Sequence, residues 1–195
     1  MRIALCALAL LAAGCTVLAP QHDPSRFYTL SARDAAPVGR GAGLSVVVGP
    51  VTVPAYLDRN EVAVRVSPTE LKYALAERWA EPLMQGFTRV LVEDLGAALG
   101  SDRVVAVTAS TGVTPDYWIE VIVVRYEADV DGSAELTARW AVRDAARKVL
   151  RIRQSQHARQ AAAATTEDRV SALSAALGDL ADEMATVLRE IRAER

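Results

Sequence analysis

The pattern of hydrophobic and polar positions divides the chain into short strands and two long helices. Runs rich in β-branched and aromatic residues predict strands, and strict alternation with polar residues predicts one wet face. The predicted strands are 27–30, 44–53, 61–66, 104–107, 117–130, 135–143 and 149–158. Because short turns separate the last three, they predict an antiparallel meander. In the first half of the stretch 117–130, apolar residues occupy both odd and even positions. We therefore expect both faces of this strand to be covered.

Two amphipathic stretches predict helices. The first begins near Pro82, whose missing N–H costs nothing in a first turn, and ends near Gly100. The second begins at Thr165 or Thr166, a cap followed by acidic residues that suit the helix dipole. Its apolar positions recur at steps of three and four: Val170, Leu173, Leu177, Leu180, Met184, Val187 and Ile191. This stripe either packs on the sheet or forms a coiled-coil seam with a partner.

These elements predict an α/β (α+β) two-layer sandwich, in which two main helices cover a mostly antiparallel sheet. The 195 residues are 51% hydrophobic and 24% charged, which excludes a disordered chain and suits one domain over 27–195. The 22 Lys and Arg nearly balance the 24 Asp and Glu. A net charge of −2 with 5% aromatic residues argues against nucleic-acid binding.

The N-terminus carries an export signal and the sequence of a lipid anchor. Arg2 precedes the apolar run 3–13, which is shorter than the roughly 20 residues that span a bilayer. The run ends in Leu-Ala-Ala-Gly-Cys15, which resembles the lipobox of bacterial lipoproteins. This resemblance implies that the signal peptide 1–14 is removed and that Cys15 carries a diacylglyceryl group and an N-acyl chain. The alternative is an unmodified Cys15 behind a plain secretory signal.

The segment after Cys15 has the composition of a tether. Residues 15–26 are unpatterned and contain proline, so we expect a lipidated tether that ends where the first strand begins. In the lipoprotein class, an Asp directly after the Cys retains the protein at the inner membrane. Thr16 stands there instead, which implies the periplasmic face of the outer membrane.

Three motifs that mark common enzyme classes are missing from the sequence. It lacks a phosphate-binding GxxxxGK[ST] loop, a GxSxG nucleophile elbow and an HExxH zinc motif. His157 stands alone on a predicted strand, without a motif that would make it a catalytic base. We therefore expect no catalytic residue, no metal and no cofactor apart from the lipid on Cys15.

A cluster of basic residues lies in the last two predicted strands. Seven Lys and Arg fall between 139 and 159, against the single acid Asp144. Arg151 and Arg153 share a strand face with His157 and Arg159. The cluster is either a solvated face relieved by nearby acids or a docking surface for an acidic protein partner or anionic lipid heads, with Arg151 and Arg153 as contact residues.

The segment 48–99 carries a family resemblance. It contains VGPVTVPAYLDRNEVAVRV, then ERWAEPL, then FTRVLVEDLGAAL. Together with the lipobox and the early FYTL strand, it resembles the PqiC-type lipoproteins, also described as ABC-type transport auxiliary lipoproteins. The family pattern is matched by these residues: Gly49, Pro50, Val51, Pro54, Tyr56, Leu57, Arg59, Arg78, Trp79, Ala80, Glu81, Pro82, Leu83, Asp94 and Leu95.

Within this segment the turn after Pro54 holds candidate contact residues. Tyr56, Leu57 and Arg59 at a loop tip would form a set of residue types that is frequent in protein interfaces. The alternative is that Tyr56 and Leu57 fold back onto the core. We expect Trp79 to be a structural core anchor and Pro82 to set the start of the first helix.

The resemblance implies a non-catalytic role as an accessory subunit that docks a lipid transporter at the outer membrane. The implied partners are subunits of MCE-type or ABC-type transporters, and the membrane is reached through the lipid anchor. Homo-oligomers remain open at this stage. Two other functions also remain open: a lipoprotein that carries lipid in its own cleft, and an exported hydrolase with a nucleophile beside His157.

Overall fold

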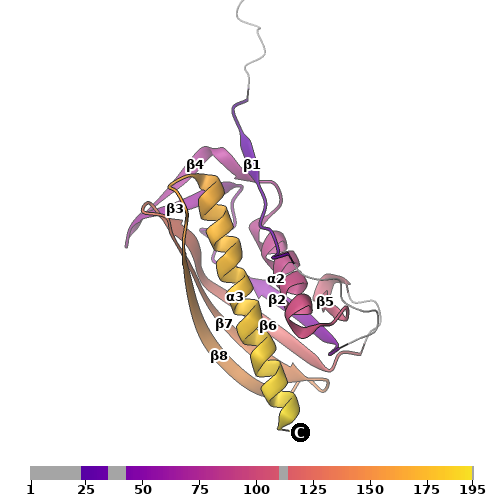
Figure 1. Ribbon diagram of the computed structural model, residues 1–195. Helices are drawn as coiled ribbons and strands as arrows, with labels where there is room; N and C mark the ends of the chain where they lie inside the picture. The colour runs from indigo at the N-terminus through magenta and orange to yellow at the C-terminus, as the bar shows by residue number, and fades with distance from the viewer. Residues whose placement is uncertain (1–22, 35–42, 110–113, 195) are drawn as a thin grey trace, which may run out of the picture.

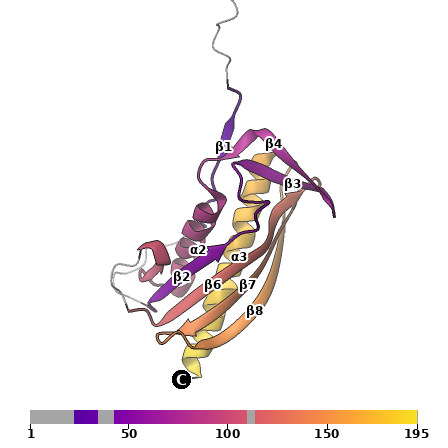
Figure 2. The same ribbon diagram turned by 180° about the vertical axis from the view of Figure 1, so that it is seen from behind.

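The computed structural model describes residues 23–34, 43–109 and 114–194, and it has an α+β architecture (Figures 1 and 2). Two helices cover an eight-stranded sheet, as expected for the α+β class. The sheet is mixed, because parallel pairings join the antiparallel ones that were predicted. The strands are β1 Arg26–Tyr28, β2 Val46–Thr52, β3 Glu61–Ser67, β4 Glu70–Trp79, β5 Val104–Ala106, β6 Tyr117–Asp129, β7 Ser133–Asp144 and β8 Val149–Gln160. The helices are α2 Leu83–Leu99, the short 3-10 turn η2 Val107–Ala109 and α3 Thr166–Ala193.

The long strand β6 organises the sheet. On one side it pairs along its length with β7, which pairs in turn with β8, so the predicted antiparallel meander is confirmed. On its other side it pairs in parallel with β2 near its start and with β3 near its end. Strand β4 pairs antiparallel with β3, β1 adds in parallel to β4, and β5 adds in parallel to β2.

Both helices lie on the same face of the sheet. Helix α3 crosses β7 and β8, α2 packs on β2 and β5, and the two helices pack against each other. All seven positions of the α3 stripe are buried within the chain, so the stripe packs on the sheet instead of forming a coiled-coil seam. The core joins both layers: the ring of Phe87 in α2 meets that of Tyr126 in β6 edge-on, with ring centroids 5.2 Å apart.

The opposite face of β6 is open, contrary to our expectation from its sequence. Ile122, in the apolar first half of the strand, is 57% exposed, and Val124, directly after that half, is 44% exposed. The reason is that both α2 and α3 cover the other face, and Figure 2 shows the sheet from the uncovered side. Covering on both faces was therefore a wrong prediction for this strand.

The helix ends follow the sequence signals. Pro82 directly precedes α2, and its carbonyl accepts the N–H of Gly86. Gly100 ends α2 in the left-handed conformation, with a φ of 61°, which glycine adopts without strain. Thr165 caps α3, and its hydroxyl accepts the backbone N–H of Asp168.

Strand β4 was missed in the sequence. Buried and exposed positions alternate only weakly in its first half. The register on β3 then shifts: Ala74 pairs with Val62, whereas Arg78 pairs with Glu61. Residues 75–77 therefore have no partner on β3, and the period of two is broken. Trp79 ends the strand as a buried residue of the hydrophobic core.

Candidate functional site

The turn between β2 and β3 folds back onto the sheet. Leu57 is only 3% exposed and belongs to the hydrophobic core, so its predicted exposure at a loop tip is wrong and the fold-back alternative holds. The turn is closed by the carbonyl of Pro54, which accepts the N–H of Leu57 at 2.9 Å. Arg59 stays half-exposed, with its guanidinium 4.4 Å from the ring centre of Tyr73 and 3.3 Å from Glu61.

Tyr56 ties this turn to a buried carboxylate. Its hydroxyl donates to Oε2 of Glu127 at 2.9 Å, and Glu127 is 1% exposed. Burial, followed by the negative charge of Glu127, raises the pKa of Tyr56 to about 12, so the phenol remains a neutral donor at physiological pH. The hydroxyl of Tyr73 donates to the carbonyl of Tyr56 at 3.1 Å and fixes the turn from a second side.

Two arginines neutralise Glu127. The Nε atoms of Arg65 and Arg125 donate to its Oε1 at 2.6 Å and 2.9 Å. Arg125 also donates to Asp129 and to Glu135, so the buried charge belongs to a connected network. Sequence reasoning did not single out Glu127, because its partners Tyr56 and Arg65 lie 71 and 62 residues earlier in the chain. The network fastens the 54–59 turn to β6 through Tyr56, and Arg59 lies half-exposed at the end of this turn.

The basic face of β8 meets acids of α3. Arg151 donates to both carboxylate oxygens of Glu194 at 3.1 Å, and Arg153 lies 3.8 Å from Glu190. Further along, the same face carries the pairs His157–Glu183 at 3.1 Å and Arg159–Asp179 at 2.6 Å. These contacts favour the alternative that nearby acids relieve the basic charge, while Arg151 and Arg153 remain partly exposed.

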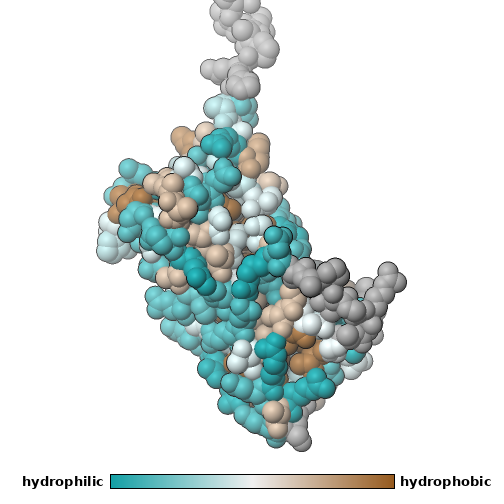
Figure 3. Space-filling model, in the orientation of Figure 1, coloured by the Kyte–Doolittle hydropathy of each residue, from teal (hydrophilic) through white to brown (hydrophobic). Residues whose placement is uncertain are grey.

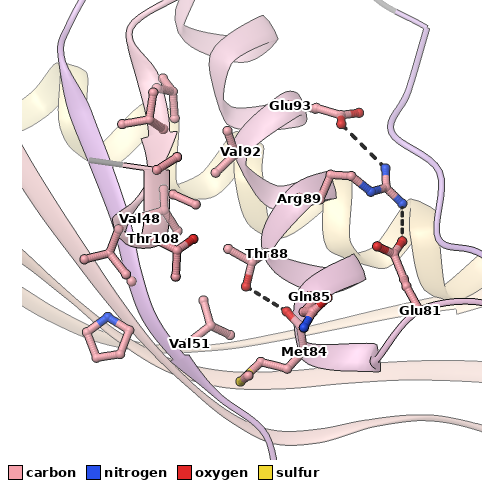
Figure 4. A pocket seen from close by; sticks show the side chains of 17 residues that line it. Val48, Val51, Glu81, Met84, Gln85, Thr88, Arg89, Val92, Glu93 and Thr108 are labelled. Carbon is pink, nitrogen blue, oxygen red and sulfur yellow. Dashed lines mark hydrogen bonds and ion pairs between the residues drawn. The ribbon is translucent and has the colours of Figure 1, made fainter. Parts of the chain in front are cut away.

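An apolar groove separates α2 from the β2–β5 edge of the sheet. Its volume is about 800 Å³. Val48 and Val51 of β2 face Met84 and Thr88 of α2 across it, and Val92 adds a further apolar side chain (Figure 4). Figure 3 shows a mostly hydrophilic surface on the helix side, with a hydrophobic area beside α2 and β5. The groove therefore offers an apolar surface of the size that small ligands use.

The charged residues at this groove are already paired. Arg89 donates to Oε1 of Glu81 at 2.7 Å and to the carbonyl of Leu30 at 2.9 Å, and it lies 3.5 Å from Glu93. Figure 4 shows Arg89, Glu93 and Glu81 on the side of α2 that is turned away from Val48 and Val51. The groove therefore presents methyl groups and a thioether, with the polar side chains of Gln85, Thr88 and Thr108 among them.

The described residues contain neither a metal-binding cluster nor a membrane-spanning helix. They contain no cluster of three or more His, Cys, Asp or Glu side chains placed to hold a metal ion. Neither α2 nor α3, nor any other helix within the described ranges, combines the length and apolar composition needed to cross a membrane. Cys15, the signal peptide 1–14 and most of the tether 15–26 lie outside the described residues.

The sequence matches one protein family over most of its length. Residues 28–185 match the ABC-type transport auxiliary lipoprotein component. The chain belongs to this family. The match runs from Tyr28, the last residue of β1, to Ala185 in α3, so the resemblance carried by the 48–99 segment is confirmed.

Solved structures agree with the family assignment at the level of the fold. An uncharacterized protein superposes with a TM-score of 0.69 at 22% identity, covering 84% of this chain and 98% of its own. A Xanthomonas campestris protein of family DUF330 has a TM-score of 0.65 at 21% identity, covering 82% of this chain and 92% of its own.

A more distant likeness is to the PelC dodecamer from Paraburkholderia phytofirmans. Its TM-score is 0.40 at 14% identity, with coverage of 77% of this chain and 92% of that one. No curated protein matches the sequence. The comparisons thus give the family and its fold.

Proposed function

We propose that this chain is a non-catalytic accessory subunit of an MCE-type or ABC-type lipid transport system. In this proposal it is anchored through lipidated Cys15 at the periplasmic face of the outer membrane and docks the transporter there. The observation that carries the proposal is the match to the ABC-type transport auxiliary lipoprotein component over residues 28–185. The lipobox-like sequence that ends at Cys15 supports it independently.

The domain has the surface chemistry of a docking module. Arg59 lies half-exposed at the end of a turn that Tyr56 fastens to the buried Glu127, so a partner would meet a preorganised contact. Arg151 and Arg153 are partly exposed and lie on one face of β8 near the end of α3. Leu57 takes no direct part in this proposal, because its side chain is buried.

Co-purification from membranes tests the docking role. The lipidated protein, extracted in mild detergent, is expected to retain transporter subunits. Arg59→Glu, and separately the double variant Arg151→Glu with Arg153→Glu, should weaken this association without unfolding the domain. Arg139→Glu is the matched control, because Arg139 lies on the opposite face of the sheet and contacts Gln154. Retention of the same subunits by all variants would contradict the assignment of these arginines.

Two further measurements test the anchor. The intact mass of the detergent-extracted protein should correspond to a chain that starts at Cys15 and carries a diacylglyceryl group and an N-acyl chain. Membrane fractionation should place it with the outer membrane. A cleaved chain with an unmodified Cys15 would refute the lipid anchor.

The apolar groove favours a second candidate function, in which the domain itself binds lipid. A space of about 800 Å³ between Met84 and Val51 is large enough for part of an acyl chain. Native mass spectrometry after gentle purification separates the two candidates. Bound phospholipid that is lost on Val51→Trp, a substitution that fills the groove, would favour a carrier, and an empty protein would favour the docking module.

A further inference from the structure

Two strongly exposed apolar side chains lie at the end of the molecule where the described chain begins. Leu75 is 79% exposed and Phe27 is 62% exposed. Strands β1 and β4 pair in parallel, with Phe27 opposite Arg78 and Arg26 opposite Glu77. Leu75 precedes Glu77 by two residues, so both side chains belong to the same end of the sheet. Figures 1 and 2 show β1 and the bend of β4 together at this end.

The exposure of Leu75 follows from the bulge in β4. Residues 75–77 have no partner on β3, and β1 pairs with 77–79 instead. The strand therefore bends outward and carries Leu75 away from the core. Single exposed apolar residues are common on protein surfaces. What distinguishes Phe27 and Leu75 is their position, since both lie beside the point where the chain continues toward Cys15.

The polar groups around this pair suit a phospholipid surface. Arg26 directly precedes Phe27, and its guanidinium lies 5.7 Å from the ring centre of Tyr28. Arg78 is the partner of Phe27 across the β1–β4 ladder. The acids at this end include Asp23, Glu77, which accepts a hydrogen bond from Thr166 of α3, and Glu61, which is the β3 partner of Arg78. The first turn of α3 adds Glu167 and Asp168. Aromatic and aliphatic side chains flanked by arginine are typical of protein regions at a membrane interface, where guanidinium groups meet phosphates.

The length of the tether limits how far this end lies from the bilayer. Residues 16–25 separate Cys15 from β1, and the fully extended chain from Cys15 to Arg26 spans at most about 35–40 Å. Along the chain, β1 and its partner β4 are therefore the part of the domain that follows an acylated Cys15 first. Strand β8 is separated from β1 by β4, β3, β6 and β7 in the sheet. It carries Ile152, which is 70% exposed.

We propose that Phe27 and Leu75 contact the phospholipid surface of the membrane in which Cys15 is anchored. This inference rests on the lipid anchor of the proposed function and adds an orientation to it. The β1–β4 end faces the bilayer, with Arg26 and Arg78 at the level of the phosphates. The C-terminal end of α3, where Arg151 pairs with Glu194, then points away from the membrane toward the periplasm and is accessible to a transporter.

Site-directed spin labelling of the mature lipidated protein tests this orientation. The chain has two cysteines, Cys6 in the signal peptide and Cys15 at the anchor, so a new cysteine in the mature acylated protein is the one free thiol. Phe27→Cys, Leu75→Cys and the control Ile152→Cys are labelled separately with a nitroxide. Each protein is reconstituted in vesicles of phosphatidylethanolamine and phosphatidylglycerol at a ratio of about 3:1, chosen so that the surface is anionic.

The readout is the ratio of oxygen to nickel-chelate collisions with each label, which rises with depth in a bilayer. We expect this ratio at positions 27 and 75 to be several-fold higher than at 152. Equal, water-like ratios at all three positions would overturn the proposal, and so would a high ratio at 152, which would place the open sheet face on the membrane.

A second measurement separates this inference from the proposed function. The intact mass of the same samples reports the acylation of Cys15. An acylated protein with water-like labels at 27 and 75 overturns the orientation alone. An unmodified Cys15 overturns the anchor of the proposed function and this inference with it.

Discussion

The guanidinium of Arg33 lies against Gly178 in the middle of α3. Its Nη2 donates to the carbonyl of Gly178, and its Nη1 donates to Asp182 at 2.8 Å. A Cβ at position 178 would come within 2.5 Å of the Nε of Arg33, so the absence of a side chain makes this contact possible. The backbone N–H of Arg33 donates to Asp94 of α2 at 2.9 Å. Arg33 therefore ties the segment after β1 to both helices.

We predict that the effect of Gly178→Ala on stability depends on Arg33. In a helix interior, Ala is more favourable than Gly by about 1 kcal/mol. In the natural chain, this gain is offset because the new methyl group displaces the guanidinium. In an Arg33→Ala background, Gly178→Ala should stabilise the protein by about the full 1 kcal/mol. Urea unfolding of the four proteins measures the coupling, and an equal effect in both backgrounds would contradict the packing that we describe.

We predict that Asp94→Asn changes how stability depends on pH. Asp94 is 3% exposed, and burial raises the pKa of its carboxyl group, partly opposed by the N–H of Arg33. The folded state thus holds this proton more tightly than the unfolded state does. The contribution of Asp94 to stability therefore falls as the pH rises from its unfolded pKa through its raised folded pKa. Asn does not titrate.

The unfolding free energy of Asp94→Asn minus that of the natural protein should increase with pH across this window and then level off. Urea titrations between about pH 4 and pH 8 cover the window above the ordinary carboxyl pKa. Asp94→Ala serves as the control, because it removes both the titrating carboxyl group and the acceptor for the backbone N–H of Arg33. A difference between Asp94→Asn and the natural protein that does not vary with pH would rule out the raised pKa.

We predict that Tyr56→Phe destabilises the domain more than Tyr73→Phe does. Tyr56 donates to the buried carboxylate of Glu127, and hydrogen bonds to charged groups contribute about 1.5–3 kcal/mol. Tyr73 donates to the neutral carbonyl of Tyr56, for which about 0.5–1.5 kcal/mol is typical. Both substitutions remove one hydroxyl, so they form a matched pair in thermal or urea unfolding. The reverse order would contradict the role assigned to Glu127.

We predict opposite outcomes for two neighbours in the 54–59 turn. Leu57→Ala should cost about 2–5 kcal/mol of stability, as for other buried leucines, because Leu57 is 3% exposed. Arg59→Ala should leave stability nearly unchanged, because its side chain is half-exposed. Unfolding curves and membrane co-purification of the same two variants separate stability from docking. Loss of stability on Arg59→Ala would show that this side chain has a structural role.

The elements with strong local signals were predicted well. The α3 stripe has regular spacing and a capping threonine, and helices with such signals form in most tertiary settings. The β6–β7–β8 meander needs only short turns between neighbouring strands, so its topology follows from chain order. Gly100 ended α2 as expected, because its conformation is local.

The candidate contact residues were predicted less well, because burial depends on distant partners. Leu57 and Arg59 stand two positions apart in one turn, yet one lies in the core and the other is half-exposed. The acids that face Arg151 and Arg153 lie some forty residues later, on α3. The local pattern of β8 does not predict which helix packs across this strand.

The sequence by itself determined the family, the α+β class, the two long helices and the β6–β7–β8 meander, because these follow from local periodicity, caps and a motif. Only the tertiary structure decided which face of β6 is left open, that Glu127 is a buried hub, and that β4 bulges to expose Leu75. These features depend on where both helices lie and on strand register. Register and packing are set by contacts between residues far apart in the chain, which no local pattern encodes.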